Sequence, residues 1–192
     1  MKRPLAATCE EEEEEEVDET VVTVIDNHIY FYSEIDTRTT FQLHSALHRL
    51  IKKYEHWKQI EVFIHLMTNG GNIFCGFATY DLLRSFKDVI FTVIVEGCCA
   101  SAGTLILLAA QRRVIRPNGF LLVHHISNTF WGGNFKDFED EMTNMTTLTK
   151  KLRRIYKQHT ILSEDRLKDI LNRDVWFSAK KSKKLGFVDS IE

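Results

Sequence analysis

The chain has 192 residues, of which 44% are hydrophobic and 27% are charged, and these values fit one globular domain with a sizeable core. No apolar run approaches the roughly 20 residues of a membrane-spanning helix, and no apolar stretch follows Lys2 and Arg3, so the sequence predicts neither a membrane protein nor a secretory signal. We therefore expect the protein in the cytoplasm.

The net charge of −2 hides a strongly acidic N-terminus. Residues 1–20 carry 2 basic and 9 acidic side chains, a net charge of −7, so the other residues together carry +5. Because the glutamate run at 10–16 repels itself and stays hydrated, we expect residues 1–20 to form a disordered arm before a folded domain at 21–192. The basic side chains of that domain form no stripe with interleaved aromatics, so nucleic-acid binding is not expected.

The first half of the domain alternates between strand and helix patterns. Short β-prone runs at 21–25 and 28–32 predict two strands separated by a turn. An apolar stripe at steps of three and four residues predicts a helix at about 39–57, with Asp36 or Thr37 as its cap.

Two longer apolar runs, at 60–67 and 89–95, predict buried strands, and the spacing of phenylalanine and leucine between them predicts a second helix. The first run ends in Thr-Asn-Gly-Gly at 68–71, where paired glycines suit a tight turn with exposed N–H groups. This alternation predicts an α/β fold with parallel strands joined by right-handed crossovers.

The stretch Gly-Cys-Cys-Ala-Ser-Ala-Gly at 97–103 joins the strand at 89–95 to a segment, ending at Ala110, that is apolar on every side. A helix of that composition has to be buried. The small residues around Ser101 allow a sharp turn that would present its hydroxyl beside backbone N–H groups, as a nucleophile requires. The alternative is that Ser101 simply caps a core helix.

The second half of the domain contains shorter elements and one long helix. An amphipathic stripe predicts the helix at about 135–159, and its apolar face suits packing against another helix, including one of a second subunit. The other expected elements are strands at 114–115, 120–125 and 187–189, and short helices capped by Ser163 and Ser178.

The four cysteines, Cys9, Cys75, Cys98 and Cys99, show no metal-ligand spacing. Because Cys98 and Cys99 are adjacent, they are a poor start for a disulfide framework, and we expect small buried side chains rather than a redox centre. We accordingly expect no bound metal.

A serine nucleophile needs a base, and the base needs an orienting group. The candidates for the base are His124 and His125, and because side chains alternate along a strand only one of them can face Ser101. The candidate acid is Asp174, which we expect on a turn between two helices. Sequence periodicity alone does not bring these residues together in space.

Four motifs follow one another along the chain: Thr-Asn-Gly-Gly at 68–71, Gly-Cys-Cys-Ala-Ser-Ala-Gly at 97–103, Arg-Pro-Asn-Gly-Phe-Leu-Leu-Val-His-His at 116–125, and Arg-Asp-Val-Trp-Phe-Ser-Ala with Gly-Phe-Val-Asp-Ser-Ile at 173–191. In this order and at this spacing, the chain from about residue 28 to 191 resembles the proteolytic subunit of the Clp protease (ClpP). The family consists of serine peptidases with a crotonase-like fold. The resemblance implies an α/β fold of repeated β-β-α units with a protruding handle helix.

The resemblance also assigns roles to individual residues. It implies that Ser101 is the nucleophile, His124 its base and Asp174 the third member of the triad. The backbone N–H groups of Gly71 and Ala102 would form the oxyanion hole, where such donors contribute on the order of 3–4 kcal/mol each. The resemblance thus predicts a serine endopeptidase with a Ser-His-Asp mechanism.

At the level of assembly, the resemblance implies that the helix near 135–159 interleaves two heptameric rings into a closed tetradecamer. Unfolded polypeptides would be cleaved inside this chamber, and a Clp-type AAA+ ATPase would hydrolyse the ATP, so the chain itself would need no cofactor. Three segments depart from the family pattern. Cys98-Cys99-Ala100 replaces the usual Gln-Ala-Ala before the serine, and His125-Ile126 replaces the usual Gln-Pro after the histidine. Residues 1–27 do not match the family's N-terminal loop and first helix.

Two other functions remain open at this point. The chain could be an inactive, structural subunit of a mixed ring. It could instead be a crotonase-fold acyl-CoA enzyme, which would share the paired N–H donors but would not use a serine nucleophile.

Overall fold

The computed structural model describes residues 21–127 and 133–192, so the acidic arm expected at 1–20 lies outside the described residues. The described residues form a mixed α/β fold, as the alternating pattern predicts. Its elements are β1 (Val22–Ile25), β2 (His28–Tyr32), α1 (Thr37–Lys53), β3 (Ile60–Thr68), α2 (Ile73–Ser85), β4 (Val89–Ala100), α3 (Gly103–Ala109), β5 (Arg112–Ile115), β6 (Phe120–Val123), α4 (Phe135–His159), α5 (Glu164–Leu171), β7 (Val175–Ser178), α6 (Ala179–Lys184) and β8 (Ser190–Ile191). No helix within these ranges is both long and apolar enough to cross a lipid bilayer.

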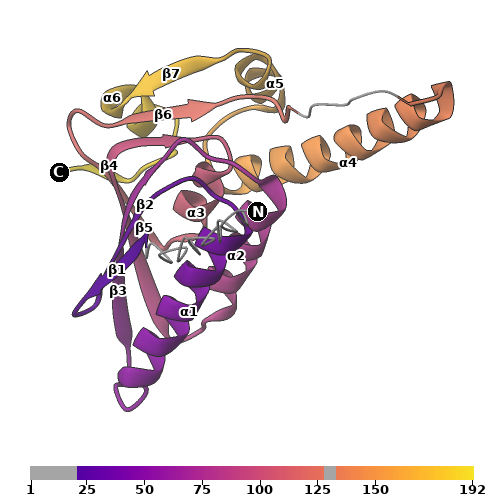
Figure 1. Cartoon of the computed structure of the whole chain (residues 1–192). Helices are drawn as coiled ribbons and strands as arrows, with labels where there is room; N and C mark the ends of the chain where they lie inside the picture. The colour runs from indigo at the N-terminus through magenta and orange to yellow at the C-terminus, as the bar shows by residue number, and fades with distance from the viewer. Residues whose placement is uncertain (1–20, 128–132) are drawn as a thin grey trace, which may run out of the picture.

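One sheet organises the described residues, with the strand order β1-β2-β3-β4-β5-β8; β6 pairs with β4 off this path, and β7 pairs with β6. Strands β2 to β5 run parallel, and β1 forms an antiparallel hairpin with β2. Helices α1, α2 and α3 lie on one side of this sheet (Figure 1). The predicted cap of α1 is confirmed, because the Asp36 carboxylate accepts the N–H of Thr39 at 2.7 Å.

Strand β4 is longer than the apolar run at 89–95 predicts, because it continues through Ala100. Its middle pairs with β5 at residues 92–95, and its end pairs with β6 at residues 98–100. This second pairing brings the end of β6 beside the turn that follows β4. The extension of β4 therefore positions Ser101, the residue that follows it.

Helix α4 has two different halves. Its C-terminal half belongs to the core, where Leu152, Ile155 and Tyr156 are buried. Its N-terminal half projects from the body (Figure 1) and exposes apolar side chains, with Phe135 at 78% and Met142 at 70% exposure. The predicted amphipathic helix is thus confirmed, and its projecting half carries an apolar surface on the outside of the fold.

Two predictions about the C-terminal part are wrong. Asp174 does not lie on a turn between two helices, because strand β7 begins at the next residue and pairs antiparallel with β6. The last strand is 190–191 rather than 187–189. The apolar character of Phe187 and Val188 reflects burial in the core rather than strand pairing.

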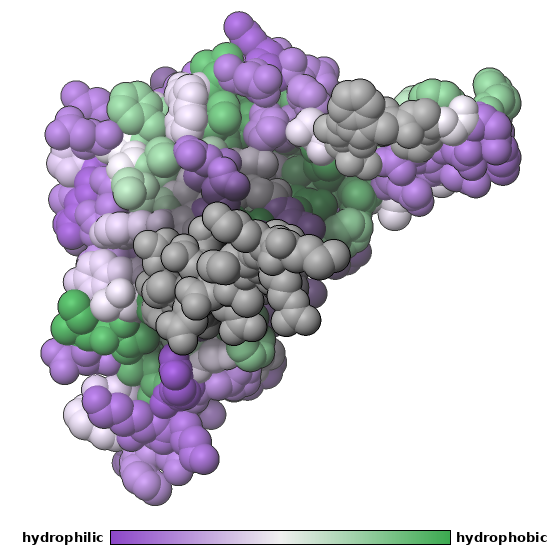
Figure 2. Space-filling view, viewed as in Figure 1, coloured by the Kyte–Doolittle hydropathy of each residue, from purple (hydrophilic) through white to green (hydrophobic). Residues whose placement is uncertain are grey.

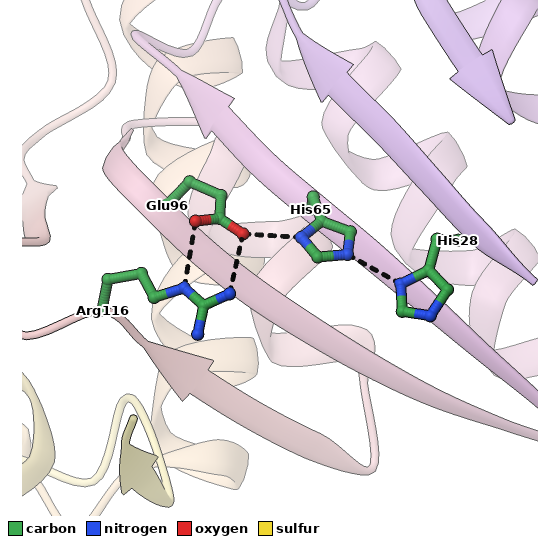
Figure 3. A network of polar contacts seen from close by, with 4 residues as sticks. All are labelled: His28, His65, Glu96 and Arg116. Carbon is green, nitrogen blue, oxygen red and sulfur yellow. Dashed lines mark hydrogen bonds and ion pairs between the residues drawn. The ribbon is translucent and has the colours of Figure 1, made fainter. Parts of the chain in front are cut away.

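A chain of polar contacts crosses the sheet on the face turned away from the core (Figure 3). His28 Nδ1 lies 2.8 Å from His65 Nε2, and His65 Nδ1 lies 2.6 Å from Glu96 Oε1. Arg116 donates its Nε–H to the other oxygen of Glu96 at 3.0 Å. Burial raises the pKa of Glu96, but the hydrogen bonds from Arg116 and His65 outweigh it and leave that pKa below its ordinary value. Glu96 is therefore held as a carboxylate between two donors.

Candidate active site

Ser101 occupies the turn between β4 and α3. Its φ of +53° lies in the left-handed region, which is rare for a residue with a Cβ atom and is typical of serines displayed on a strand-to-helix turn. Its N–H donates to the carbonyl of Leu122 at 2.9 Å, and its carbonyl accepts the N–H and hydroxyl of Thr104. These bonds hold the strained backbone in place.

The alternative role of Ser101 as a helix cap is contradicted. Helix α3 begins at Gly103, its N-cap is Ala102, and no side chain caps it. Every residue of α3 is buried, as its all-apolar sequence predicts. The Ser101 hydroxyl is therefore not used to cap the helix.

Strand pairing carries His124 to the same place. In the β4–β6 ladder Ala100 is opposite Leu122, so Ser101 directly follows the paired end of β4 and His124 lies two residues beyond the paired end of β6. Both residues line one pocket. Among the described residues, no hydrogen bond joins the Ser101 hydroxyl to either neighbouring histidine, and in free enzymes such catalytic bonds are often long until substrate binds.

Asp174 reaches His124 through the next ladder. Val123 is opposite Val175 in the antiparallel β6–β7 pair, so the following cross-strand pair is His124 and Asp174. Their Nδ1 and Oδ1 atoms lie 3.6 Å apart, an ion-pair distance that is too long for a hydrogen bond. The imidazole is 19% exposed and the carboxylate 66% exposed. The acid therefore meets the base at the rim of the pocket.

The surroundings of His124 favour the neutral imidazole. Burial lowers its pKa below the ordinary value, the charge of Asp174 acts in the opposite direction, and His125 lowers it further. A neutral ring whose Nδ1 faces the carboxylate has Nε2 available as a proton acceptor. His124 is thus suited to act as a general base near neutral pH.

Gly71 and Ala102, the residues whose backbone N–H groups are the expected oxyanion donors, line the same pocket. Within the described part of the chain neither N–H has a hydrogen-bond acceptor, although the neighbouring Asn72 N–H donates to Ile35. A Cβ atom on Gly70, where φ is +98°, would lie 2.6 Å from the Cβ of Ser101. The glycine turn therefore packs against the serine turn, and the residues that carry the two donors without acceptors share a pocket with Ser101.

The pocket itself has a volume of about 630 Å³ and lies between the body and α4. Figure 2 shows the hollow beneath the projecting helix, with hydrophobic residues inside it. Its lining includes Phe74, Ile126, Met145, Leu148 and Leu152 together with the polar groups named above. The pocket thus combines apolar side chains with several polar groups, a combination that ligand sites use for binding and orientation.

Comparison with known proteins identifies the family. The profile of the Clp protease family matches residues 11–192. The chain belongs to the Clp protease family. The match begins nearer the N-terminus than the motif resemblance at 28–191 indicates.

Individual Clp proteins give the same result. The chain is 30% identical over 133 residues to the ATP-dependent Clp protease proteolytic subunit of Deinococcus radiodurans, an alignment that covers 68% of this chain and 64% of the relative. For subunit 1 of Streptomyces avermitilis the identity is 31%, over 68% of this chain and 60% of the relative. The alignments with this chain therefore span less than two thirds of the length of these two relatives.

A solved structure shows the same fold. A mutant of ClpP1 from Listeria monocytogenes superposes with a TM-score of 0.76, over 87% of this chain and 91% of that chain, at 22% identity. At this identity the likeness bears on the fold alone. It supports the predicted ClpP-like α/β architecture.

Most of the site residues named from the Clp resemblance lie together. Ser101, His124, Gly71 and Ala102 line one pocket, and Asp174, which does not line it, forms an ion pair with His124. The contribution of α4 to the pocket wall is not predicted from the sequence. The apolar stripe of α4 predicts packing against another helix, whereas Met145, Leu148 and Leu152 of that stripe line the pocket.

The cysteines beside Ser101 differ in environment. Cys99 is fully buried, and burial raises the pKa of its thiol, so it behaves as the small hydrophobic side chain that we expect. Cys98 is half-buried, with Sγ 3.8 Å from the carbonyl oxygen of Thr68. All three cysteines in the described residues are free.

Proposed function

We propose that the chain is the proteolytic subunit of a Clp-type protease and hydrolyses peptide bonds of unfolded polypeptides by a Ser-His-Asp mechanism. One observation supports this above all: the strained Ser101 shares a pocket with His124 and with two N–H donors that have no acceptor among the described residues. Each component of acyl transfer chemistry is therefore present at one place.

The reaction would begin with Ser101. Its Oγ attacks the scissile carbonyl carbon while His124 Nε2 takes the hydroxyl proton. The carbonyl oxygen becomes negatively charged and is stabilised by the N–H groups of Gly71 and Ala102. His124 then gives its proton to the leaving amine, and a water molecule releases the acyl group by the same steps in the second half-reaction.

Asp174 would stabilise the imidazolium that forms on His124. Its carboxylate faces Nδ1, so it also favours the tautomer in which Nε2 lacks a proton. Because the carboxylate is largely exposed, this contribution is expected to be smaller than that of a buried acid.

An extended substrate would lie along the residues after β6. Residues 125–127 line the pocket or adjoin it, and their backbone groups make no hydrogen bond to other described residues. Such an unpaired stretch can pair with a peptide added as a β-strand. This arrangement would hold the scissile bond beside Ser101.

Ser101→Ala tests the chemistry. We expect the variant to lose cleavage of fluorogenic peptides and labelling by a fluorophosphonate, with an unchanged circular dichroism spectrum. Undiminished turnover would refute the serine mechanism. A wild-type chain that assembles but neither cleaves nor reacts would instead support a structural ring subunit.

We propose further that the chain works as a homo-oligomer of heptameric rings stacked in pairs, in the cytoplasm, with a Clp-type AAA+ ATPase that supplies unfolded substrate and hydrolyses ATP. The exposed apolar surface on the projecting half of α4 supports the assembly, because such a surface favours burial against another helix. No cofactor, nucleic acid or membrane is part of this proposal.

Met142→Lys tests the assembly. Met142 is 70% exposed on α4, so the substitution should leave the monomer folded but place a charge in the proposed interface. We expect mass photometry to show a lower assembled fraction than for the wild type. An unchanged mass distribution would contradict the role of α4.

A further inference from the structure

His125 is a histidine that the peptidase mechanism does not use, yet it lies at the centre of the site. Its ring centroid lies 5.9 Å from that of His124, and the two rings are nearly perpendicular. One ligand atom each of His124, His125 and Asp174 lies within 4.8 Å of the other two. Among the described residues, this is the one group of three such side chains close enough to share a metal ion.

The donor set suits zinc. Two imidazole nitrogens and one carboxylate oxygen are common Zn²⁺ ligands, and three protein ligands with one open position describe an accessible zinc site. With metal–ligand distances of about 2.0–2.1 Å, ligand atoms in a tetrahedral site lie about 3.3 Å apart. His124 Nδ1 and Asp174 Oδ1, at 3.6 Å, already come close to this spacing.

The side chains that must move are free to do so. His125 and Asp174 are exposed, whereas His124 is the more enclosed member of the group. Rotation of the two exposed side chains can therefore close the remaining gap around the nitrogen of His124. The half-buried ring would act as the fixed ligand.

We propose that His124, His125 and Asp174 bind Zn²⁺ reversibly and that the bound ion inhibits the peptidase. This proposal rests on the proposed function for its inhibitory consequence, but the binding itself does not depend on Ser101. The ion would occupy the position between Nδ1 of His124 and the carboxylate of Asp174.

The inhibition follows from the protons of the imidazole. A metal ion on Nδ1 requires that nitrogen to be unprotonated, so the one proton of the neutral ring sits on Nε2. Nε2 then has no lone pair to accept the proton of Ser101. The ion also binds the Asp174 carboxylate, which would otherwise stabilise the imidazolium. His124 therefore stops acting as a general base without any covalent change.

The binding test uses the full chain without a histidine tag, in the Ser101→Ala background. Isothermal titration calorimetry with ZnCl₂ should show one site per chain. His125→Gln should weaken that site at least about tenfold, whereas His56→Gln, which changes an exposed histidine on another surface, should leave it unchanged. Equal zinc affinity in the His125→Gln and His56→Gln variants would overturn the proposal.

The activity test uses the chain with Ser101 intact. Zinc should inhibit peptide cleavage, EDTA should restore it, and the half-inhibitory zinc concentration should rise at least about tenfold in His125→Gln, each rate being compared with the same variant's metal-free rate. A chain that binds zinc as expected but never cleaves would refute the peptidase and retain the metal site. A chain that cleaves but whose zinc response does not depend on His125 would refute the metal site alone.

Discussion

Replacing Asp174 with asparagine probes the weakest contact of the proposed triad. The substitution keeps the size of the side chain and removes its charge. The affected contact is the 3.6 Å pair between Nδ1 of His124 and Oδ1 of Asp174, which is too long for a hydrogen bond. Its effect on the imidazolium is therefore electrostatic.

The distance and exposure give the expected size of that effect. Two unit charges 3.6 Å apart interact by about 1 kcal/mol in water and by about 4–5 kcal/mol at an effective dielectric constant of about 20. Because the carboxylate is 66% exposed, the true value lies toward the lower limit. We expect kcat/KM to fall about 5- to 50-fold, compared with about 10⁴-fold for the same change in proteases with a buried aspartate.

The pH dependence of kcat/KM gives a second, sign-specific result. Burial lowers the pKa of His124 below its ordinary value of 6.5, and the carboxylate opposes this by stabilising the imidazolium. The wild-type rate should therefore fall on acidification only below that value. Removing the carboxylate lowers the pKa further, so the acid limb of the Asp174→Asn profile should move to lower pH while its plateau falls.

The assay is peptide cleavage across pH in a buffer containing EDTA, with Asp169→Asn as the matched control. Asp169 is an exposed carboxylate paired with Arg166 on α5, so its neutralisation changes the net charge equally without touching His124. A loss near 10⁴-fold would refute the electrostatic argument and show that substrate draws Asp174 into a tight hydrogen bond. A shift of the acid limb to higher pH would contradict the conclusion that the Asp174 carboxylate raises the pKa of His124.

Two further predictions concern the scaffold. Gly70→Ala should lower the free energy of unfolding by about 1–3 kcal/mol in a denaturant titration and reduce cleavage, because φ is +98° and the new Cβ would collide with Ser101. Glu96→Gln should lower the free energy of unfolding by about 1–3 kcal/mol at pH 7, because Arg116 and His65 lose a charged acceptor. The pKa of Glu96 in the folded protein lies below its ordinary value, so the carboxylate stabilises the fold fully at pH values above the ordinary pKa. The difference in unfolding free energy between wild type and variant should therefore disappear as the pH falls through the folded pKa.

Each of these substitutions has a control within the chain. Gly97→Ala adds a methyl group whose nearest neighbour is the flexible Met67 side chain at 3.1 Å, so it should change stability less than Gly70→Ala. Glu61→Gln breaks an exposed pair with Arg112, which should contribute little. Equal effects in a variant and its control would contradict the corresponding structural argument.

The residues of the site could be named from the sequence, but the contact with the acid could not be explained from it. Ser101 and His124 follow apolar runs that predict strands, and paired strands end side by side. Asp174 precedes β7, which has only four residues. Its sequence Val-Trp-Phe-Ser does not alternate between apolar and polar residues, and both Val175 and Trp176 are exposed, so the segment lacks the pattern that would predict a strand. Because the sequence does not predict β7, it also does not predict the strand register that places Asp174 opposite His124.

Errors at the ends of strands have a similar cause. Residues 98–100 continue β4 although they are small and not β-branched, because their backbone pairs with β6. Residues 190–191 pair with β5 through their backbone, whereas the apolar residues just before them pack into the core. Side-chain patterns report burial, and in these segments burial and strand pairing occur at different residues.

Helix α4 links the pocket to the proposed subunit interface. Met145 and Leu148 line the pocket, while Phe135 and Met142, on the projecting half of the same helix, are exposed. Because one wall of the pocket is part of this helix, burying its outer half against another subunit would also fix the position of that wall. Activity per chain should therefore rise with the assembled fraction, and a fully active isolated monomer would show that the wall needs no such support.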